Sequence, residues 1–263
     1  PLFQCNAMRI ASWNVNSIKS RLDIVTNWLS SGACDVLLIQ ETKSQDVNFP
    51  VDAFTSIGWN VAIHGQKSYN GVAIASHFPI NDIITGLPGD DTDEQARYIE
   101  ARIERAHLAS IYLPNGNPAP GPKFDYKLGW MERLNQRATA LLATEQPVVL
   151  GGDFNVIPDD RDCYDPLGWE GDALTRPETR KAFRRLAYSG YCDALRARHP
   201  DDVIYTYWDY QAGAWQRDNG VRIDHLMLSP EAADRLVEVG VDKVPRGLEK
   251  PSDHTPIWCE LDI

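Results

Sequence analysis

The chain alternates between short apolar runs that suit strands and a few longer segments with helical spacing. Residues 35–40 form a continuous apolar run, typical of a strand buried on both faces, and residues 8–15 have a similar pattern. Apolar positions recur at helical spacing over residues 18–31, 122–144 and 175–188 and predict three helices. Shorter apolar runs bounded by Gly, Pro, Asn or Asp predict further strands at residues 59–64, 71–76, 80–85, 98–104, 106–113, 147–150, 203–208, 221–228 and 255–261.

The order of these elements favours one fold class. Strands outnumber helices and occur in consecutive groups, so two packed sheets covered by helices fit better than one doubly wound sheet. Both halves run strand, helix, strand and then more strands, which suggests an internal pseudo-repeat. No linker interrupts residues 8–263, which we predict to be one domain, whereas residues 1–7 resemble a protease-site or cloning remnant. At the first helix, Asn16 or Ser17 is the expected N-cap.

Composition narrows the functional classes. The net charge of −11 argues against affinity that comes from a broad basic surface, although a bound metal can supply local positive charge at a phosphate. Five scattered cysteines, with no C-x-x-C pair, suggest reduced thiols and a cytoplasmic location. No apolar run is long enough to span a membrane, and no signal peptide is visible, so we expect no membrane partner.

Polar side chains follow two of the predicted buried strands. Glu41 ends the run at residues 36–39, where a carboxylate suits a hard cation such as Mg²⁺, although a helix cap or a solvated strand end would look the same. Asp153 and Asn155 follow another run through two glycines. Asp153 could accept a proton from water and Asn155 could orient that water, while a plain Asx turn is the alternative.

A histidine near the C-terminus is the other candidate. Asp253 and His254 are adjacent, so in extended backbone their side chains point in opposite directions and cannot pair. Asp224 is therefore the predicted partner of His254. A carboxylate keeps an imidazole positively charged, which would let it neutralise a phosphoryl oxygen. The other histidines are interpreted as hydrogen-bonded structural residues.

Two further groups could contact a substrate. Tyr112 lies near the end of the strand predicted at residues 106–113, and Asn115 lies in the turn that follows. A phenol and an amide there could hold a phosphate, although a simple turn explains them equally. Trp208, Tyr210 and Trp215 lie in a polar stretch beside arginines. Such aromatics could stack on bases or wedge into a groove, or they could form a satellite hydrophobic cluster.

Taken jointly, these segments resemble the exonuclease III family of the exonuclease–endonuclease–phosphatase superfamily, which also includes deoxyribonuclease I and inositol polyphosphate phosphatases. The resemblance covers nearly all of residues 8–263. Its matching segments are residues 12–16, 38–43, 69–73, 112–116, 151–155, 222–225 and 252–254. Residues 41–43 and 69–71 favour the DNA-repair branch over the phosphatases, and residues 113–117 favour the bacterial subgroup.

The resemblance implies an α/β fold of the deoxyribonuclease I type, a four-layer sandwich of two packed, mainly antiparallel sheets flanked by helices. It implies a Mg²⁺- or Mn²⁺-dependent DNA-repair enzyme that cuts double-stranded DNA 5′ to abasic sites. It also implies 3′→5′ exonuclease and 3′-phosphatase or phosphodiesterase activity on blocked 3′ ends. We expect the enzyme to be a monomer.

The resemblance also assigns roles to residues. Glu41 would be the main metal ligand, with Asn14 and Asp253 around it. Asp153 would be the base, assisted by Asn155, and Asp224 would orient His254. His254 and Tyr112 would hold the scissile phosphate, and Asn115 would contact the substrate. Trp215 would insert into the DNA, and Trp208 with Ile223 would form a pocket for the extrahelical abasic sugar.

One departure and two alternatives qualify this prediction. Asn16 stands where some relatives carry an acid, which favours one catalytic metal over two. A phosphatase of the same superfamily, acting on a small or lipid-linked phosphate, is the first alternative. A non-catalytic binding module with the same fold is the second. The balance between endonuclease and exonuclease activity would depend on the loop at residues 208–220.

Overall fold

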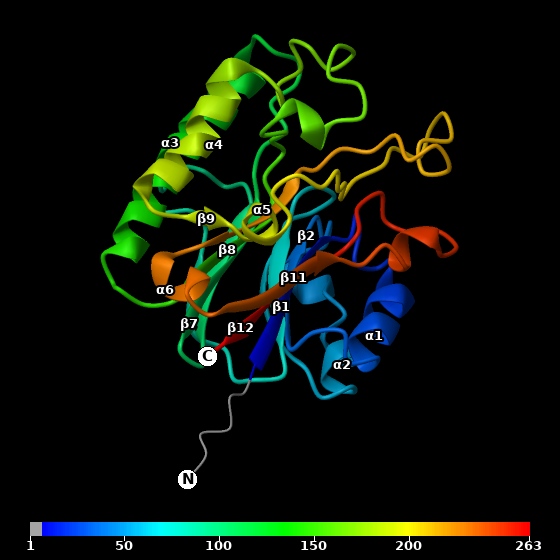
Figure 1. Cartoon of the computed structure of the whole chain (residues 1–263). Helices are drawn as coiled ribbons and strands as arrows, with labels where there is room; N and C mark the ends of the chain where they lie inside the picture. The colour runs from blue at the N-terminus through cyan, green and yellow to red at the C-terminus, as the bar shows by residue number, and fades with distance from the viewer. Residues whose placement is uncertain (1–6) are drawn as a thin grey trace.

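A computed structural model describes residues 7–263, so the predicted remnant at residues 1–7 lies, apart from Ala7, outside the described residues. The chain forms two six-stranded sheets (Figure 1). The first sheet has the order β11 (Leu236–Val241), β12 (Ile257–Asp262), β1 (Ala7–Asn14), β2 (Val36–Gln40), β4 (Val72–Ser76) and β3 (Asn60–His64). The second has the order β5 (Asn81–Thr85), β6 (Tyr98–Ile103), β7 (Ala106–Tyr112), β8 (Val148–Asp153), β10 (Asp224–Leu228) and β9 (Cys192–Asp193).

Each sheet has one parallel pair at its centre. β1 pairs with β2 and β7 pairs with β8 in parallel, and all other pairings are antiparallel. Each parallel pair is connected through a helix, α1 (Leu22–Ser30) or α3 (Pro122–Leu142). This shared plan supports the predicted pseudo-repeat. The other helical segments are α2 (Val51–Thr55), α4 (Pro177–Ser189), α5 (Ala194–Arg198), α6 (Pro230–Ala233) and the short η1 (Asp46–Asn48), η2 (Asp160–Asp162) and η3 (Pro245–Gly247).

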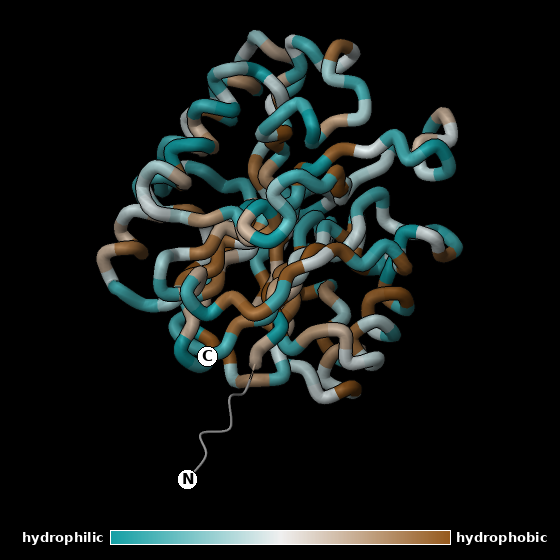
Figure 2. Tube along the Cα trace, in the orientation of Figure 1, coloured by the Kyte–Doolittle hydropathy of each residue, from teal (hydrophilic) through white to brown (hydrophobic). Residues whose placement is uncertain are grey.

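The two sheets pack face to face and helices cover their outer faces. Along β2, Val36 and Leu38 join the core between the sheets, whereas Leu37 and Ile39 pack under α1 and α2. This alternation is what the two-residue period of a strand requires when both faces are buried. On the other side, α3 and α4 cover the second sheet. In Figure 2 the hydrophobic stretches of the trace gather in the middle of the molecule. The predicted four-layer sandwich is confirmed.

This topology gathers the predicted polar residues at one edge of the sandwich. The carboxyl ends of two parallel neighbours meet at the same edge of a sheet, and antiparallel neighbours begin there. The ends of β1, β2, β7 and β8 and the starts of β10 and β12 therefore carry the functional groups, namely Asn14, Glu41, Tyr112, Asp153, Asp224 and His254.

Residues 203–208 do not form the predicted strand. Tyr207 makes only isolated bridges, one to Val221 and one to His254. The Thr206 hydroxyl accepts hydrogen bonds from the backbone N–H groups of Ile223 and Asp224, both at 3.1 Å. Its backbone also bonds to Val221 on one side and to Asp253 and Thr255 on the other, so the segment crosses between the ends of the two sheets without forming a regular ladder.

The predicted N-cap of the first helix is also wrong. α1 begins at Leu22, and its N-cap residue, Arg21, makes no side-chain capping bond. Asn16 and Ser17 have φ angles of 45° and 87° and belong to a turn that precedes the helix. The side chain of Asn16 reaches Asp253 instead, at 3.1 Å. Within residues 7–263, every helix is too short or too polar to cross a bilayer.

Gly151 in β8 permits the close contact between the sheets. A Cβ at this position would lie 2.6 Å from Leu38 Cδ1 and 2.8 Å from Leu226 Cδ2. We expect Gly151→Ala to lower the free energy of unfolding by about 1–3 kcal/mol, the usual cost of overpacking a core. Gly129, inside α3, has open space around it, so Gly129→Ala should stabilise by about 0.5–1 kcal/mol. Urea unfolding of both variants measures the two changes in the free energy of unfolding, which should have opposite signs. Equal changes in the two variants would contradict this account.

Candidate active site

A cleft of about 250 Å³ opens at the edge where the strand ends meet. Its lining residues are Glu41, Tyr112, Asn115, Asn117, Asp153, Asn155, Trp169, Asp172, Leu174, Tyr207, Ile223, Asp253 and His254. Eight of the residues predicted from sequence are among them: Glu41, Tyr112, Asn115, Asp153, Asn155, Ile223, Asp253 and His254. Residues from both sheets, far apart in the chain, therefore converge on one cleft.

Asn14 connects the two sheets at the floor of this cleft. Its Nδ2 donates to Glu41 Oε2 and to Asp153 Oδ2, at 3.0 Å each. Its Oδ1 accepts from the backbone N–H of Asn16 at 3.0 Å. Asn14 is wholly buried, and its bonds fix a carboxylate of each sheet in place. In this geometry Asn14 orients Glu41, which is the predicted main metal ligand.

The predicted pair of Asp224 and His254 is present. His254 Nδ1 lies 2.8 Å from Asp224 Oδ2, and Nε2 lies 3.7 Å from Asp153 Oδ2 on the cleft side. Both carboxylates are buried. Burial acts to lower the pKa of His254, but Asp224 and Asp153 outweigh it and hold this pKa well above its ordinary value. The imidazole is therefore positively charged at neutral pH and could neutralise an anion in the cleft.

Asp153 has the electrostatics of a proton acceptor. Burial raises its pKa, and Asp224 adds to the rise, while His254 and Asn14 act in the opposite direction. The net result is a pKa above the usual range of an aspartate. A carboxylate with a raised pKa accepts a proton from water more readily, and such perturbed groups concentrate at catalytic sites.

Asn155 and Glu41 have strained backbone conformations, with φ angles of 47° and 52°. Such left-handed conformations cost about 1 kcal/mol or more for residues other than glycine and persist where surrounding bonds hold them. Asn155 Nδ2 donates to the carbonyl of Leu113 at 2.9 Å, and its backbone N–H donates to Asp153 Oδ1 at 2.9 Å. These bonds aim Asn155 beside Asp153.

Tyr112 faces the same cleft as a hydrogen-bond donor. Burial raises the pKa of its phenol well above the ordinary value, and the negative charges of Glu41 and Asp153 raise it further. The hydroxyl therefore keeps its proton across the physiological range. The Arg97 guanidinium stacks over the ring at 4.8 Å from the centroid and restrains it.

The donor set of the cleft fits a divalent cation. Carboxylate and amide oxygens are the ligands that hard cations prefer. Asp153, Asp224 and His254 bring ligand atoms within 4.8 Å of one another, but His254 already balances part of their charge through its bond to Asp224. Glu41, Asp172 and Asp253 are the other carboxylates on the cleft wall, and both oxygens of Asp172 accept from Asn117 Nδ2 at 3.1 Å. Glu41 and Asp253 are the two that the sequence predicts to hold a cation.

The apolar wall of the cleft differs from the prediction. Trp208 does not line it, because its side chain is wholly buried and packs edge-on against Trp215 with ring centroids 4.9 Å apart. Trp215 is half-buried in the same satellite cluster. The residues around Ile223 are instead Trp169, Leu174 and Tyr207. Trp169 and Leu174 lie in irregular backbone, where hydrophobic periodicity gives no indication of a shared wall.

The sandwich and the cleft together define the class of the protein as a phosphoesterase with a two-sheet fold. A family model described as Endonuclease/Exonuclease/phosphatase family matches residues 11–254. The chain belongs to this family, and the resemblance drawn from its motifs is confirmed.

Several relatives match the chain over almost its full length. Exodeoxyribonuclease III from Haemophilus influenzae is 32% identical, covering 97% of this chain and 100% of the relative. Among solved structures, a 3′-5′ exonuclease (NExo) from Neisseria meningitidis is 40% identical with a TM-score of 0.95, covering 97% of this chain and 100% of its own. An AP endonuclease from Archaeoglobus fulgidus is 38% identical with a TM-score of 0.94 and the same coverage.

Proposed function

We propose that the protein is a divalent-metal-dependent DNA-repair nuclease. It hydrolyses the phosphodiester 5′ to an abasic site and trims 3′ ends by 3′→5′ exonuclease and 3′-phosphatase or phosphodiesterase action. The convergence of Glu41, Asp153, Asn155 and His254 on one cleft, with Asp224 behind His254, carries this proposal. The named activities of the full-length relatives support it.

The residues of the cleft divide the reaction between them. Glu41 and Asp253 would hold the divalent cation, which would stabilise negative charge at the scissile phosphate. Asp153 accepts a proton from the attacking water, and Asn155 keeps that water in line. The His254 imidazolium and the Tyr112 hydroxyl hold the non-bridging oxygens, and both donors are already oriented before substrate binds. Cleavage leaves a 3′-hydroxyl.

The apolar wall accounts for recognition of an abasic site. Ile223, Leu174, Trp169 and Tyr207 flank the polar centre. An abasic nucleotide has no base to unstack, so it can swing out of the DNA duplex at little cost in free energy. Its sugar then presents an apolar face to this wall. We assign substrate contact to Asn115, which lines the same cleft.

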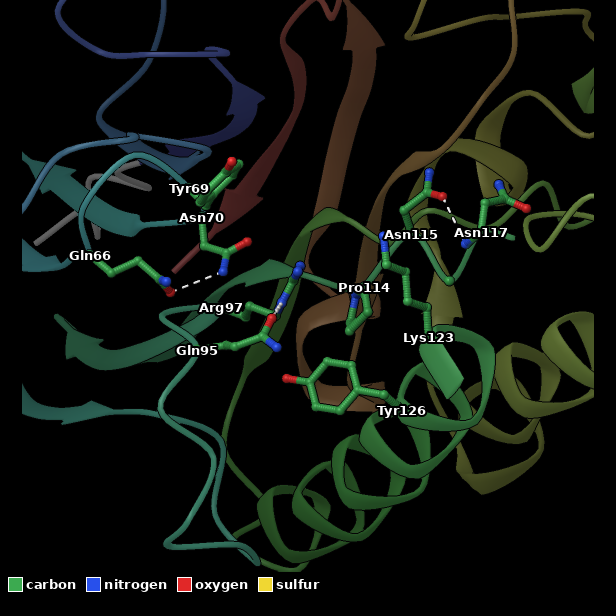
Figure 3. Close-up of a pocket in the computed structure, with 11 residues that line it drawn as sticks. Gln66, Tyr69, Asn70, Gln95, Arg97, Pro114, Asn115, Asn117, Lys123 and Tyr126 are labelled. Atoms are coloured by element: carbon green, nitrogen blue, oxygen red, sulfur yellow. Dashed lines mark hydrogen bonds between the residues drawn. The ribbon is translucent and has the colours of Figure 1, made fainter. Parts of the chain in front are cut away.

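A second pocket, of about 560 Å³, adjoins the cleft (Figure 3), and we place the path of the DNA backbone along it. It shares Asn115 and Asn117 with the cleft and is lined largely by amides and by two cations, Arg97 and Lys123. Among residues 7–263 neither cation has a carboxylate within ion-pair distance. Unpaired cations in a chain of net charge −11 indicate a polyanionic substrate.

Lys123→Gln should weaken binding of duplex DNA a few-fold and lower the slope of log Kd against log salt by about 1, the value for one phosphate contact. Arg105 is the matched control, because it lies in the turn between β6 and β7, at the end of the sheet opposite the cleft. Arg105→Gln removes the same charge and should leave the slope unchanged. Fluorescence anisotropy across a salt series measures both. Equal slopes for Lys123→Gln and the unmodified protein would remove the second pocket from the DNA path.

A gel assay on one preparation tests the function. The substrates are a duplex with one abasic site, a duplex with an intact 3′ end, a duplex with a 3′-phosphate, and inositol polyphosphate as a non-DNA phosphate. We expect cleavage of the DNA substrates with Mg²⁺ or Mn²⁺ and no product after chelation. Turnover of inositol polyphosphate without DNA cleavage would favour the phosphatase alternative.

Three finer assignments belong to the same proposal. One catalytic Mg²⁺ or Mn²⁺ suffices, because the neutral Asn16 donates to Asp253 at 3.1 Å where an acid could have held another ion. The protein acts as a monomer on DNA. Its four described cysteines are free thiols, which fits the reducing cytoplasm.

A further inference from the structure

A buried lysine lies directly beneath the cleft. Lys127, on the first turns of α3, is wholly buried, yet among the described residues no carboxylate lies within ion-pair distance of its ammonium. Its Nζ donates instead to two backbone carbonyls, that of Asn115 at 3.0 Å and that of Asn155 at 2.6 Å. The ammonium thus bonds to the two segments that carry cleft amides.

Burial of this charge opposes folding. Taking an ammonium out of water costs several kcal/mol unless close partners compensate, and here the partners are neutral carbonyls. Burial lowers the pKa of Lys127 to about 7, although the negative charges of Asp153 and Asp172 act against the fall. An apolar side chain of the same length would fill the space without that cost, so packing does not explain a lysine here.

The two carbonyls belong to loops that are joined to each other by side-chain bonds. Asn115 follows β7 and Asn155 follows β8. Asn115 Nδ2 donates to Asn155 Oδ1 at 3.3 Å, and Asn155 Nδ2 donates to the carbonyl of Leu113 at 2.9 Å. Among the described residues, the carbonyls of Asn115 and Asn155 themselves accept hydrogen bonds only from Lys127, so Lys127 is the group that fixes their direction.

Gly116 shows that the first loop is shaped around the lysine. Its φ is +90°, and a Cβ there would lie 2.6 Å from Lys127 Cδ, in the middle of the buried stem. Asn115 and the first turn of α3 adjoin the same pocket in Figure 3. The loop therefore wraps closely over the side chain, and only a glycine permits that approach.

We propose that Lys127 is a positioning residue, which ties the loops after β7 and β8 together from below and thereby aims Asn155 and Asn115 at the scissile phosphate. The proposal rests on the proposed nuclease function. Lys127 touches neither substrate nor metal. It acts through the backbone of the residues that do.

The first test is Lys127→Met, which keeps the length of the side chain and removes its hydrogen bonds. Misplacement of Asn155 should lower kcat on abasic duplex by about 10- to 100-fold, the scale on which small displacements of positioned groups act. KM should change less than about two-fold, because most DNA contacts are untouched. Lys181→Met, on the exposed face of α4, is the control and should match the unmodified enzyme. The thermal midpoint is recorded for each variant, and kcat is expressed per folded molecule.

A second pair of variants approaches the same contact from the loop. In Gly116→Ala the added methyl group would press against the side chain of Lys127. Gly86→Ala is the control, because Gly86 has a similar φ of +81° and a Cβ added there would have nothing within 4 Å. Both carry the same backbone strain, so only Gly116→Ala should lower kcat. Because Lys127 and Gly116 act through one contact, the double variant should lose little more activity than Lys127→Met alone.

The outcomes separate this inference from the function on which it rests. If the unmodified protein cleaves no DNA, the proposed function fails. If it cleaves DNA and Lys127→Met retains its kcat per folded molecule, only the positioning role is overturned. Additive losses in the double variant, or equal losses in Gly116→Ala and Gly86→Ala, would also overturn it. If Lys127→Met does not fold, the comparison of the two glycine variants decides.

Discussion

Asp153→Asn is expected to lower kcat on abasic duplex by at least about 10²-fold while the DNA still binds, since positioned acid–base catalysis contributes about 10²- to 10⁴-fold. The amide cannot accept the proton of the attacking water. It has nearly the same shape as the carboxylate, and it keeps an oxygen for the N–H of Asn155 or the amide of Asn14, which both donate to Asp153. Loss of a negative charge from the cleft should strengthen DNA binding slightly.

Single-turnover kinetics measures the rate of cleavage, and fluorescence anisotropy measures DNA binding separately. Asp52→Asn, on an exposed position of α2 away from the cleft, makes the same chemical change and should leave kcat unaltered. If Asp153→Asn retained more than about a tenth of the activity, Asp153 would not be the base. Loss of DNA binding together with kcat would point to a collapsed cleft rather than to lost chemistry.

The Asp224→Asn substitution should lower kcat by about 10²-fold near neutral pH, the scale of a lost electrostatic donor, and should make the loss depend on pH. Burial acts to lower the pKa of His254, and Asp224 is the foremost group that raises it. Without that carboxylate the imidazole loses its proton at a much lower pH than in the unmodified enzyme. The charged form exists below the pKa, so the defect should shrink as the pH falls.

The measurement is the ratio of kcat in Asp224→Asn to kcat in the unmodified enzyme, taken across about pH 5.5 to 8.5, which spans the ordinary pKa of histidine. Asp224 also raises the pKa of Asp153, so its removal should keep Asp153 ionised to a lower pH and add to the same trend. The ratio should rise as the pH falls. A ratio that is flat across this range would show that Asp224 acts without changing the charge of His254.

Much of the fold could be predicted, because most strands can be recognised from the apolar residues in their own sequence. The run at residues 36–39 is apolar at every position, and the structure buries both of its faces. Residues 203–208 resemble a strand in composition, but pairing is not a local property, and no neighbouring strand is available to them beyond isolated bridges. β11 (Leu236–Val241) was not predicted, and it is an edge strand that pairs on one side only.

The candidate site, too, could be predicted from the sequence only in part. Glu41, Asp153 and Asp224 stand at strand ends, so the order of strands brings them to one edge once the sheets form. The family resemblance places Trp208 in the cleft, whereas here it packs with Tyr205 and Trp215 in a satellite cluster, the alternative that its local sequence left open. Which aromatic side chain faces outward depends on the conformation of the loop, and the amino-acid composition of the loop does not reveal that conformation.

The amide of Asn14 spans the boundary between the sheets, and so does the bond from His254 to Asp224. A small sliding of one layer over the other would separate both pairs before either ladder broke. Inactivation on heating should therefore run ahead of the loss of circular dichroism. Two half-chains, expressed apart, could cleave nothing until they reassembled.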